Sequence, residues 1–199
     1  MAKNKEVTKQ KILEAVETII LKDGFDSLGI NAVAKSAGVD KVLIYRYFDS
    51  FDELLITFIK SKDFFSNIKI DEGIVKNIKS KEDLKQLVTK ILKEQISYIR
   101  KNKVLQEILL WELNNKNKVT DFIAKERETN GLNNINFLFK ELNNDEFLLG
   151  SASLIIGGIY YLILRAKTVD VFNTIDITSE KGWDLIERTI EKLIDLVIL

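Results

Sequence analysis

The chain of 199 residues contains no proline, although average usage would give roughly ten in this length. A proline inside a helix removes one backbone hydrogen bond and clashes with the preceding turn, so helix interiors exclude it. The absence therefore predicts a chain made almost wholly of helices. The expected fold class is all-α, with about nine helices read from the spacing of apolar residues.

Cysteine and histidine are absent as well. Their absence excludes disulfides, thiol chemistry and metal sites built on thiolate or imidazole ligands. The sequence also lacks a glycine-rich phosphate loop, a nucleophile elbow and a paired acidic metal signature. We therefore expect no enzyme, no cofactor and no bound metal. The N-terminal segment is charged and lacks the apolar stretch of a secretory signal, so a cytoplasmic location is expected.

The N-terminal third contains four short helical patterns. A first helix is expected over residues 8–22, where Gly24 stops it. A second apolar face then recurs at the spacing i, i+3, i+4 and i+7. Asp40 can cap a third helix that ends near Phe48, and Ser50 with Glu53 forms a capping box before a fourth. The second face consists of Ile30, Val33, Ala34 and Ala37.

Longer helices are expected in the remaining two thirds. The capping sequence at residues 80–83 opens one of them, and Asn/Lys-rich stretches separate the others. These patterns predict one compact domain over residues 1–62 and a second helical domain over residues 63–199. The expected helices cover residues 84–99, 104–115, 118–142, 147–164 and 179–199.

The window Ile30–Asp49 has the spacing of a helix-turn-helix. Ala34, Gly38 and Ile44 occupy its fifth, ninth and fifteenth positions. A small residue lets two helices cross closely, and glycine accepts the positive φ of the tight turn between them. Ile44 then fills the angle between the helices. This spacing alone is a modest signal, because a small residue four positions before a glycine is common.

The third helix predicts a DNA-contacting surface. Because residues four apart share a helix face, Ile44 and Phe48 should pack inward, which leaves Val42 and Arg46 outward. Apolar groups on such a face meet thymine methyls in the major groove, and arginine reaches guanine or phosphate. The alternative is that Tyr45 and Tyr47 pack at the edge of the core and Arg46 is solvated. The chain would then be a helical protein-interaction module without DNA binding.

The segment from residue 8 to about residue 60 resembles the N-terminal domain of the tetracycline-repressor (TetR) family of bacterial regulators. The resemblance rests on the pattern AxxAGVxxxxxYxYF at residues 34–48 and on the capped helix that follows. It implies a three-helix helix-turn-helix domain joined to a helical ligand-binding and dimerisation domain. The residues that it implies approach DNA are Lys41, Val42, Leu43, Tyr45, Arg46 and Tyr47.

Four positions depart from the family pattern, and together these departures remove polar contacts to the DNA backbone. Val42 stands where glycine is frequent, Leu43 where a hydroxyl residue often binds phosphate, Gly29 where a hydroxyl residue caps the second helix, and Phe51 where lysine usually contacts phosphate. Either the lysines near the N-terminus compensate for these losses, or the affinity for DNA is lower and depends more on apolar contacts to bases.

The charge near the N-terminus is locally positive. Residues 1–11 contain four lysines and one glutamate, so their balance is +3. This arm is expected either to touch the phosphate backbone or to serve as a solvated terminus. Residues 1–62 contain ten basic and nine acidic side chains. The attraction to DNA must therefore be local, and we expect a shallow dependence of affinity on salt.

Residues 147–164 form a run without a charged residue. Its length is at the lower limit for spanning a bilayer, but glycines and serines dilute it. We therefore expect a soluble helix buried on several sides and no membrane contact. Ser153 and Gly157 form a small-x-x-x-small step that would let another helix approach.

The last helix is amphipathic. Its apolar stripe could simply close its own domain, but the resemblance implies that the last two long helices pair with those of a second copy. Such a homodimer would place two recognition helices about 34 Å apart and read a palindromic operator in double-stranded DNA. The stripe consists of Trp183, Ile186, Ile190, Leu193 and Val197.

The resemblance also implies a small-molecule pocket in the C-terminal domain. Aromatic residues are expected to line this pocket, and the alternative for each of them is ordinary packing in the core. Because imidazole and thiol ligands are missing, the expected inducer is mostly apolar or aromatic. The function expected is that of a transcriptional repressor released from its operator by this ligand. The candidate ligand-binding residues are Tyr98, Trp111, Phe122, Phe137 and Tyr160.

Overall fold

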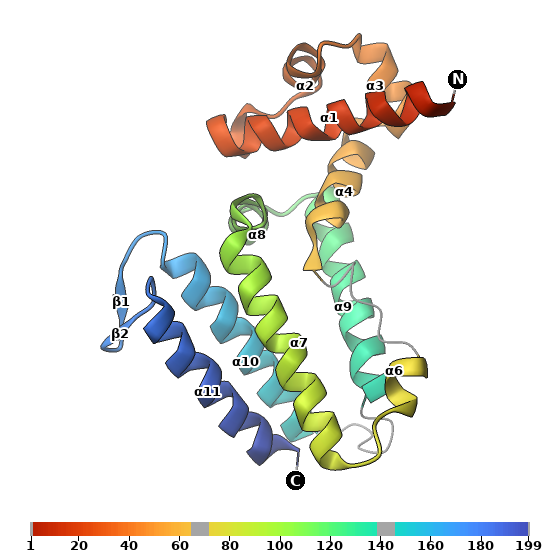
Figure 1. The fold of residues 1–199 in the computed structure, drawn as a ribbon. Helices are drawn as coiled ribbons and strands as arrows, with labels where there is room; N and C mark the ends of the chain where they lie inside the picture. Colours follow the sequence, from red (N-terminus) through yellow and green to blue (C-terminus); the bar gives the residue numbers. More distant parts are fainter. Residues whose placement is uncertain (1, 65–71, 139–145, 199) are drawn as a thin grey trace. The chain divides into compact units, whose positions relative to one another are not determined.

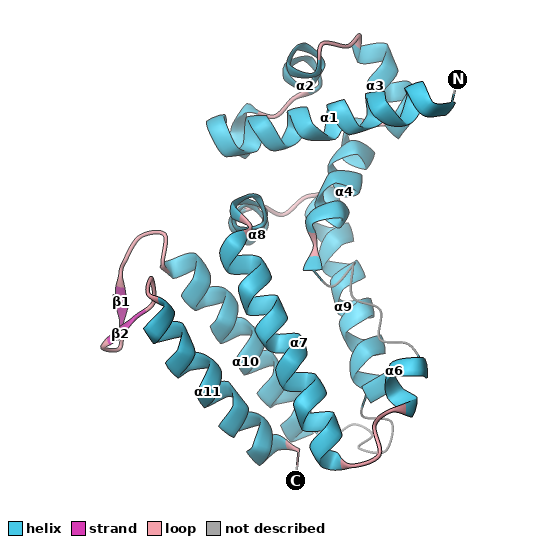
Figure 2. Cartoon of the chain, in the orientation of Figure 1, coloured by secondary structure: helices cyan, strands magenta, loops and turns pink. Residues whose placement is uncertain are grey.

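The computed structural model describes residues 2–64, 72–138 and 146–198, and nearly all of them are helical (Figures 1 and 2). The all-α prediction is confirmed. The chain divides into two compact units. The first unit comprises Met1–Ile68 and Asn102–Asn130, and the second comprises Lys69–Lys101 and Gly131–Leu199. The domain boundary predicted at residue 62 stays a prediction.

The first unit begins with the four predicted helices. They are α1 (Ala2–Asp23), α2 (Ile30–Ala37), α3 (Lys41–Phe48) and α4 (Phe51–Lys62), with a short 3-10 helix, η1 (Phe25–Ser27), after α1. Helix α1 begins six residues earlier than expected, so the N-terminal lysines lie on a helix and not on an extended arm. No glycine interrupts this segment, and helix formers continue the first turn backwards.

Two later helices complete the first unit. They are α8 (Lys103–Asn114) and the part of α9 (Lys118–Leu138) that ends at Asn130. Their buried side chains join the same hydrophobic cluster as those of α1 to α4. The N-terminal helices and α8 therefore share one core. Its members include Ile12, Val16, Val33, Ile44, Leu54, Phe58, Val104, Ile108, Val119 and Ile123.

The predicted helix caps are present. The Asp40 carboxylate accepts a hydrogen bond from the Val42 backbone N–H at 2.8 Å, and the Ser50 hydroxyl accepts one from the Glu53 N–H at 3.1 Å. At the second capping sequence, the Ser80 hydroxyl accepts from the Asp83 N–H at 3.1 Å. Hydrogen bonds from the backbone N–H of Lys79 and from Ser80 hold the pKa of the Asp83 carboxyl below its usual value.

The second unit is a helical bundle. Helices α7 (Lys81–Lys101), α10 (Glu146–Arg165) and α11 (Glu180–Val197) pack against one another (Figure 1). All three were predicted with bounds close to those observed. The short α6 (Glu72–Lys76) was not predicted. Helix α9 is described to Leu138, so the last residues of its predicted span lie outside the described part of the chain.

A short β-hairpin between α10 and α11 was also missed. Strand β1 (Val171–Phe172) pairs antiparallel with β2 (Ile175–Asp176). Asn173 and Thr174 both have positive φ, as a tight hairpin turn requires. Runs of two residues are too short for an alternating pattern to reveal, so the sequence carries no strand signal here.

The start of α11 holds the hairpin in place. The Asp176 carboxylate accepts hydrogen bonds from the Thr178 hydroxyl and backbone N–H, which lower the pKa of Asp176. The indole N–H of Trp183 donates to the Ile177 carbonyl at 2.8 Å. Gly182 lies so close to β2 that a Cβ there would be 1.8 Å from the Asp176 carbonyl oxygen. Only glycine fits at this approach.

Helix α10 is the uncharged run noted in the sequence. It is long and apolar enough to cross a bilayer by length and composition alone. The expectation that it is buried on several sides was wrong for the single chain, because much of one face is exposed. Leu154 is 79% exposed, and Phe147 and Tyr161 are exposed on the same side. The residues facing the bundle include Ile159 and Ile163.

Candidate nucleic-acid interface

Helix α3 presents the face that its sequence predicts. Ile44 is fully buried and Phe48 nearly so, whereas Val42 is 63% exposed and Tyr45 is 47% exposed. Lys41 and Arg46 are exposed, and Leu43 and Tyr47 are half-buried at the flanks. Val42, Tyr45 and Arg46 therefore face away from the core of the first unit.

The turn between α2 and α3 fixes the position of that face. Gly38 adopts φ 65°, the left-handed conformation that glycine accepts without strain. The Val39 backbone N–H donates to the Ala34 carbonyl at 3.0 Å, which satisfies one of the last carbonyls of α2. Ala34 is buried where the two helices approach. The predicted spacing therefore forms a helix-turn-helix.

Two lysines of α1 lie beside α3. The Lys5 Nζ is 5.7 Å from the centroid of the Tyr47 ring, and the Lys9 Nζ is 5.8 Å from the Phe48 ring. Because α1 extends to Ala2, these cations are held on a helix beside the last residues of α3, Tyr47 and Phe48. Sequence reasoning counted them as part of an arm and did not place them against the third helix.

The departures from the family pattern have structural counterparts. Gly29 is the N-cap of α2 and offers no side chain to the first turn. Phe51, at the start of α4, packs against the hydrophobic core. Neither position supplies a polar group to a phosphate backbone. The exposed face therefore depends on the apolar and tyrosine side chains of α3 and on the nearby cations.

The candidate ligand residues are divided between the two units. Tyr98 and Tyr160 belong to the second unit, and Trp111 and Phe122 belong to the first. The Trp111 ring stacks on Phe25 and joins the core, and Phe122 is exposed, with the Lys60 Nζ 5.7 Å from its ring centroid. The side chain of Phe137 lies outside the described part of the chain.

Gln95 is a polar core residue that sequence reasoning missed. It is fully buried, and its amide N–H donates to the Tyr160 hydroxyl at 3.1 Å. Its Oε1 has no hydrogen-bond partner among the described residues. The signal was present, because Gln95 lies one helical turn from Ile91 and from Ile99 on the apolar face of α7.

The candidate interface stripe on α11 splits into two groups. Trp183, Ile186 and Ile190 are buried inside their own unit, so these three side chains are not available to a second chain. The alternative reading of the stripe, closure of its own domain, describes them. Leu193, Ser153 and Gly157 are exposed, and Val197 is half-buried. The amphipathic pattern identifies an apolar side but not what covers it.

A larger set of apolar side chains, which includes Leu193 of the stripe, is exposed on the two long C-terminal helices. Three lie on α10 and three on α11, at spacings that place each group along one side of its helix. The exposed set is Phe147, Leu154 and Tyr161 on α10, and Leu185, Leu193 and Leu196 on α11.

No cluster of three or more acidic residues that could hold a metal ion lies in the described part of the chain.

Comparison with known sequences finds similarity in the N-terminal part of the chain. Residues 12–57 match the profile of bacterial regulatory proteins of the tetR family. An uncharacterized HTH-type transcriptional regulator of Mycobacterium tuberculosis is 34% identical over 58 residues, which are 29% of each chain. The fatty acid metabolism regulator protein of Bacillus subtilis is 28% identical over 88 residues, 44% of this chain and 45% of that one. These matches span less than half the length of the curated relatives.

Solved structures resemble the chain over almost its whole length. A TetR family transcription regulator from Marinobacter aquaeolei has 15% sequence identity and a TM-score of 0.59, with 97% of this chain and 98% of that chain covered. The fatty acid degradation regulator FadR from Bacillus halodurans has 19% identity and a TM-score of 0.59, with 95% and 97% covered. At these identities the comparison shows that the fold is shared.

Proposed function

We propose that this chain, whose residues 12–57 match the profile of bacterial regulatory proteins of the tetR family, is a sequence-specific DNA-binding regulator of transcription. The observation that carries this proposal is the outward face of α3, where Val42, Tyr45 and Arg46 are exposed while Ile44 anchors the helix. A helix of this width enters the major groove, where its exposed side chains reach base edges.

Each side chain on this face has a distinct role. Val42 is an apolar partner for a thymine methyl, and Arg46 donates to guanine or to a phosphate. Tyr45 and Tyr47 carry hydroxyls that bond phosphates and set the register. Lys5, Lys9 and Lys41 supply the cations that hold the DNA backbone. This division makes α3 the sequence reader and α1 the backbone contact.

The exposed apolar sides of α10 and α11 support a homodimer. Burying Leu154, Tyr161, Leu185 and Leu196 against a second copy removes from water four of the large apolar side chains that the second unit leaves exposed. A symmetric pair positions two copies of α3 for a palindromic operator. The dimer accounts for the uncharged character of α10 without a membrane, and a cytoplasmic location follows from binding to DNA.

The regulator we propose is a repressor without enzymatic activity that a small molecule releases from DNA. Such a ligand acts by binding better to a dimer geometry that does not fit the operator. Two similar proteins are named as regulators of fatty acid metabolism or degradation. We extend that chemistry to this chain and assign it a mostly apolar inducer of the fatty acyl class.

The test is a gel shift with duplex DNA from upstream of the chain's own gene. We expect a specific complex that Arg46→Ala weakens by about ten- to a hundredfold. Lys22→Ala is the matched control, because it also removes one positive charge. Lys22 lies near the other end of α1, about 20 Å along the helix from Lys9, which is beside α3. Circular dichroism checks that each variant is folded. Folded wild type that binds no DNA would instead indicate a helical protein-interaction module.

A further inference from the structure

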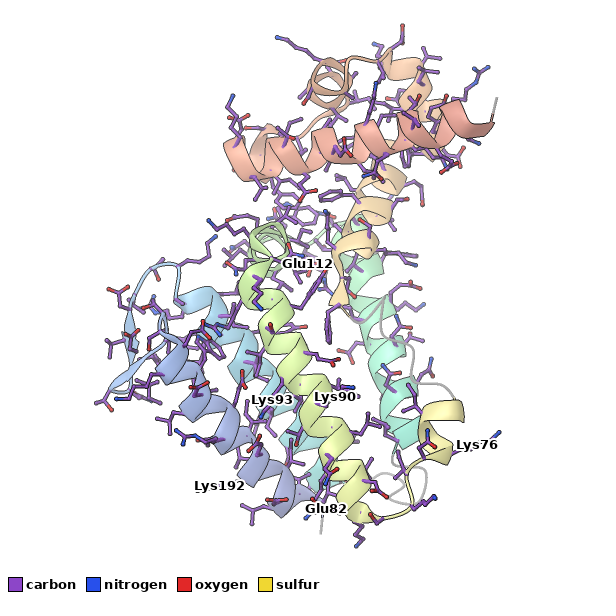
Figure 3. All side chains as sticks on the ribbon, in the orientation of Figure 1. Lys76, Glu82, Lys90, Lys93, Glu112 and Lys192 are labelled. Atoms are coloured by element: carbon purple, nitrogen blue, oxygen red, sulfur yellow. The ribbon has the colours of Figure 1, made fainter. Side chains whose placement is uncertain are left out.

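The link between the recognition helix and the helix that follows it is very short. Helix α3 ends at Phe48 and α4 begins at Phe51. Asp49 and Ser50 alone join them (Figure 3, in which the described side chains are drawn on the ribbon). The Asp49 backbone N–H closes the last turn of α3 by donating to the Tyr45 carbonyl at 2.9 Å. The direction in which α4 leaves α3 therefore depends on the backbone angles of these two linking residues.

Asp49 has a strained backbone conformation. Its φ of 61° and ψ of −41° lie outside the small left-handed region that side-chain-bearing residues tolerate, because ψ is positive in that region. The Ser50 backbone N–H donates to the Phe48 carbonyl at 2.6 Å, across Asp49. A hydrogen bond of this span around a residue of positive φ defines a γ-turn, and the form with positive φ is rare and strained.

The chain uses glycine at comparable positions but not here. Among the described residues of the first unit, positive φ occurs at Gly24, Gly38 and Asp49. Glycine adopts such angles without strain, whereas the Cβ of an aspartate crowds the backbone. Aspartate can offset part of this cost through a local hydrogen bond of its side chain. The exposed Asp49 carboxylate makes no hydrogen bond or ion pair with any described residue, so its side chain does not offset the strain.

Both sides of the turn are fixed, which explains why the strained angles persist. Phe48 is buried in the core of the first unit, and the Ser50 hydroxyl caps α4. Helices α3 and α4 also pack against each other. At positive φ a residue with a Cβ has a narrow range of ψ, whereas glycine accepts a wide one. The Cβ of Asp49 therefore restricts the rotation of α3 against α4.

We propose that Asp49 is a positioning residue for sequence recognition, a role that rests on the proposed binding to DNA. The strained turn holds the outward face of α3 at one angle to α4 within the first unit. Hydrogen bonds to base edges depend on accurate distances and angles, whereas phosphate contacts carry no sequence information. A freer turn therefore reduces discrimination between DNA sequences more than it reduces general affinity for DNA.

Two variants separate the backbone of Asp49 from its charge. Asp49→Asn removes the negative charge but keeps a side chain of the same shape. Asp49→Gly removes the charge and also the Cβ that causes the strain. The difference between the two variants therefore reports the backbone alone. Asp26→Gly is the control for glycine itself, because Asp26 is an exposed aspartate of the same unit without positive φ.

Thermal unfolding and hydrogen exchange of the full-length protein test the turn itself. We expect Asp49→Gly to melt about 2–4 °C above Asp49→Asn because strain is relieved, and Asp26→Gly to melt below wild type. Asp49→Gly should nonetheless lower the protection of the backbone N–H groups of residues 49 and 50 about tenfold relative to Asp49→Asn. A melting temperature no higher, or protection no lower, than in Asp49→Asn would overturn the proposal.

Gel shifts with the upstream duplex and with an unrelated duplex test the role in recognition. We expect the ratio of the two affinities to fall about tenfold in Asp49→Gly. The ratio should keep its wild-type value in Asp49→Asn, because a charge acts on both duplexes alike. An unchanged ratio in Asp49→Gly, or an equal fall in both variants, would contradict positioning by the turn. Wild type that binds no DNA would defeat the proposed function, while the protection of residues 49 and 50 still decides whether Asp49 fixes the turn.

Discussion

The indole ring of Trp111 lies flat against the phenyl ring of Phe25, with centroids 4.6 Å apart and planes 8° from parallel. Phe25 belongs to η1, directly after α1, and Trp111 belongs to α8. The stack therefore connects the N-terminal helices to a helix that follows them by some forty residues. The Trp111 ring packs against the core of the first unit.

Trp111→Ala should lower the free energy of unfolding by about 2–3 kcal/mol, because it removes the stacked ring and leaves a cavity beside Phe25. Trp111→Phe should lower it much less, since a ring remains. Urea unfolding followed by circular dichroism measures both. Phe122→Ala is the control, because Phe122 is an exposed aromatic of the same unit. Equal losses in Trp111→Ala and Phe122→Ala would contradict the role of the stack.

Gly182→Ala should destabilise the second unit by about 2–3 kcal/mol, since the new Cβ would meet backbone that has to shift. The Asp176 carbonyl oxygen would be 1.8 Å and its carbon 2.8 Å from that Cβ. Thermal unfolding measures the effect. Gly131→Ala is the control, because a Cβ there meets nothing within 4 Å. That change should raise stability by about 0.5–1 kcal/mol through helix propensity, and equal behaviour of the two variants would contradict the close approach.

Glu112→Gln should stabilise the folded protein at neutral pH. Burial raises the pKa of Glu112 in the folded state, so its favourable contribution is present at low pH and is lost as pH rises through the folded pKa. The Glu112 carboxylate accepts a hydrogen bond from Nη1 of Arg127 on α9, and Nε of the same guanidinium donates to Asp63. We expect the variant to melt about 2–4 °C above wild type at pH 7.5. The difference should vanish toward pH 4.

Glu180→Gln is the matched control for the pH series, because the pKa shift of Glu180 is opposite in sign to that of Glu112. Hydrogen bonds from Arg100 lower the pKa of Glu180, so its contribution is present above its unfolded pKa and is lost as pH falls through the folded one. The variant should melt slightly below wild type at pH 7.5 and match it in acid. If the melting temperature of Glu112→Gln changed with pH in the same way as that of Glu180→Gln, burial would not be the main cause of the pKa shift of Glu112.

Lys5→Gln and Lys9→Gln should each weaken DNA binding and reduce the salt slope by about one, because each removes a cation beside α3. The slope is the change in log affinity with log salt concentration in gel shifts. Lys22→Gln, at the other end of α1, should leave the slope unchanged. The slope of the wild type itself should be shallow, since residues 1–62 are nearly neutral overall. A steep slope insensitive to Lys5 and Lys9 would place the phosphate contacts elsewhere.

Leu154→Glu should prevent self-association, because it places a charge at the most exposed apolar position of α10. We expect a loss of about 2 kcal/mol or more in dimer stability, the scale of a central interface residue. Sedimentation velocity measures the oligomeric state. Leu113→Glu is the control, because Leu113 is 75% exposed on α8 in the first unit. If both variants stay dimeric, the dimer uses another surface.

The features that depend on local order were predictable. Ser80 and Asp83 cap α7 as expected, and Ile44 and Phe48 point inward because a helix places residues four apart on one side. The exposed face of α3 follows from the same geometry. These signals lie within a few residues of one another, so a single sequence contains them.

The features that depend on distant partners were not predictable. The hairpin is held by the approach of Gly182 to Asp176, and the stack pairs Trp111 with Phe25. The stripe through Trp183 is apolar whether its own unit or a second chain covers it. The charges of Asp63, Glu112 and Arg127 look like solvated helix residues in the sequence. Their significance comes from burial, which only the packing reveals.

The two tryptophans of the chain fall one in each unit, with Trp111 in the first and Trp183 in the second. Their intrinsic emission is therefore two separable optical signals in an unlabelled protein. Replacing Trp111 with phenylalanine leaves an emitter that reports the second unit alone, and replacing Trp183 leaves one that reports the first. Spectra of the two single-emitter proteins can thus assign any response to an added compound to one half of the molecule.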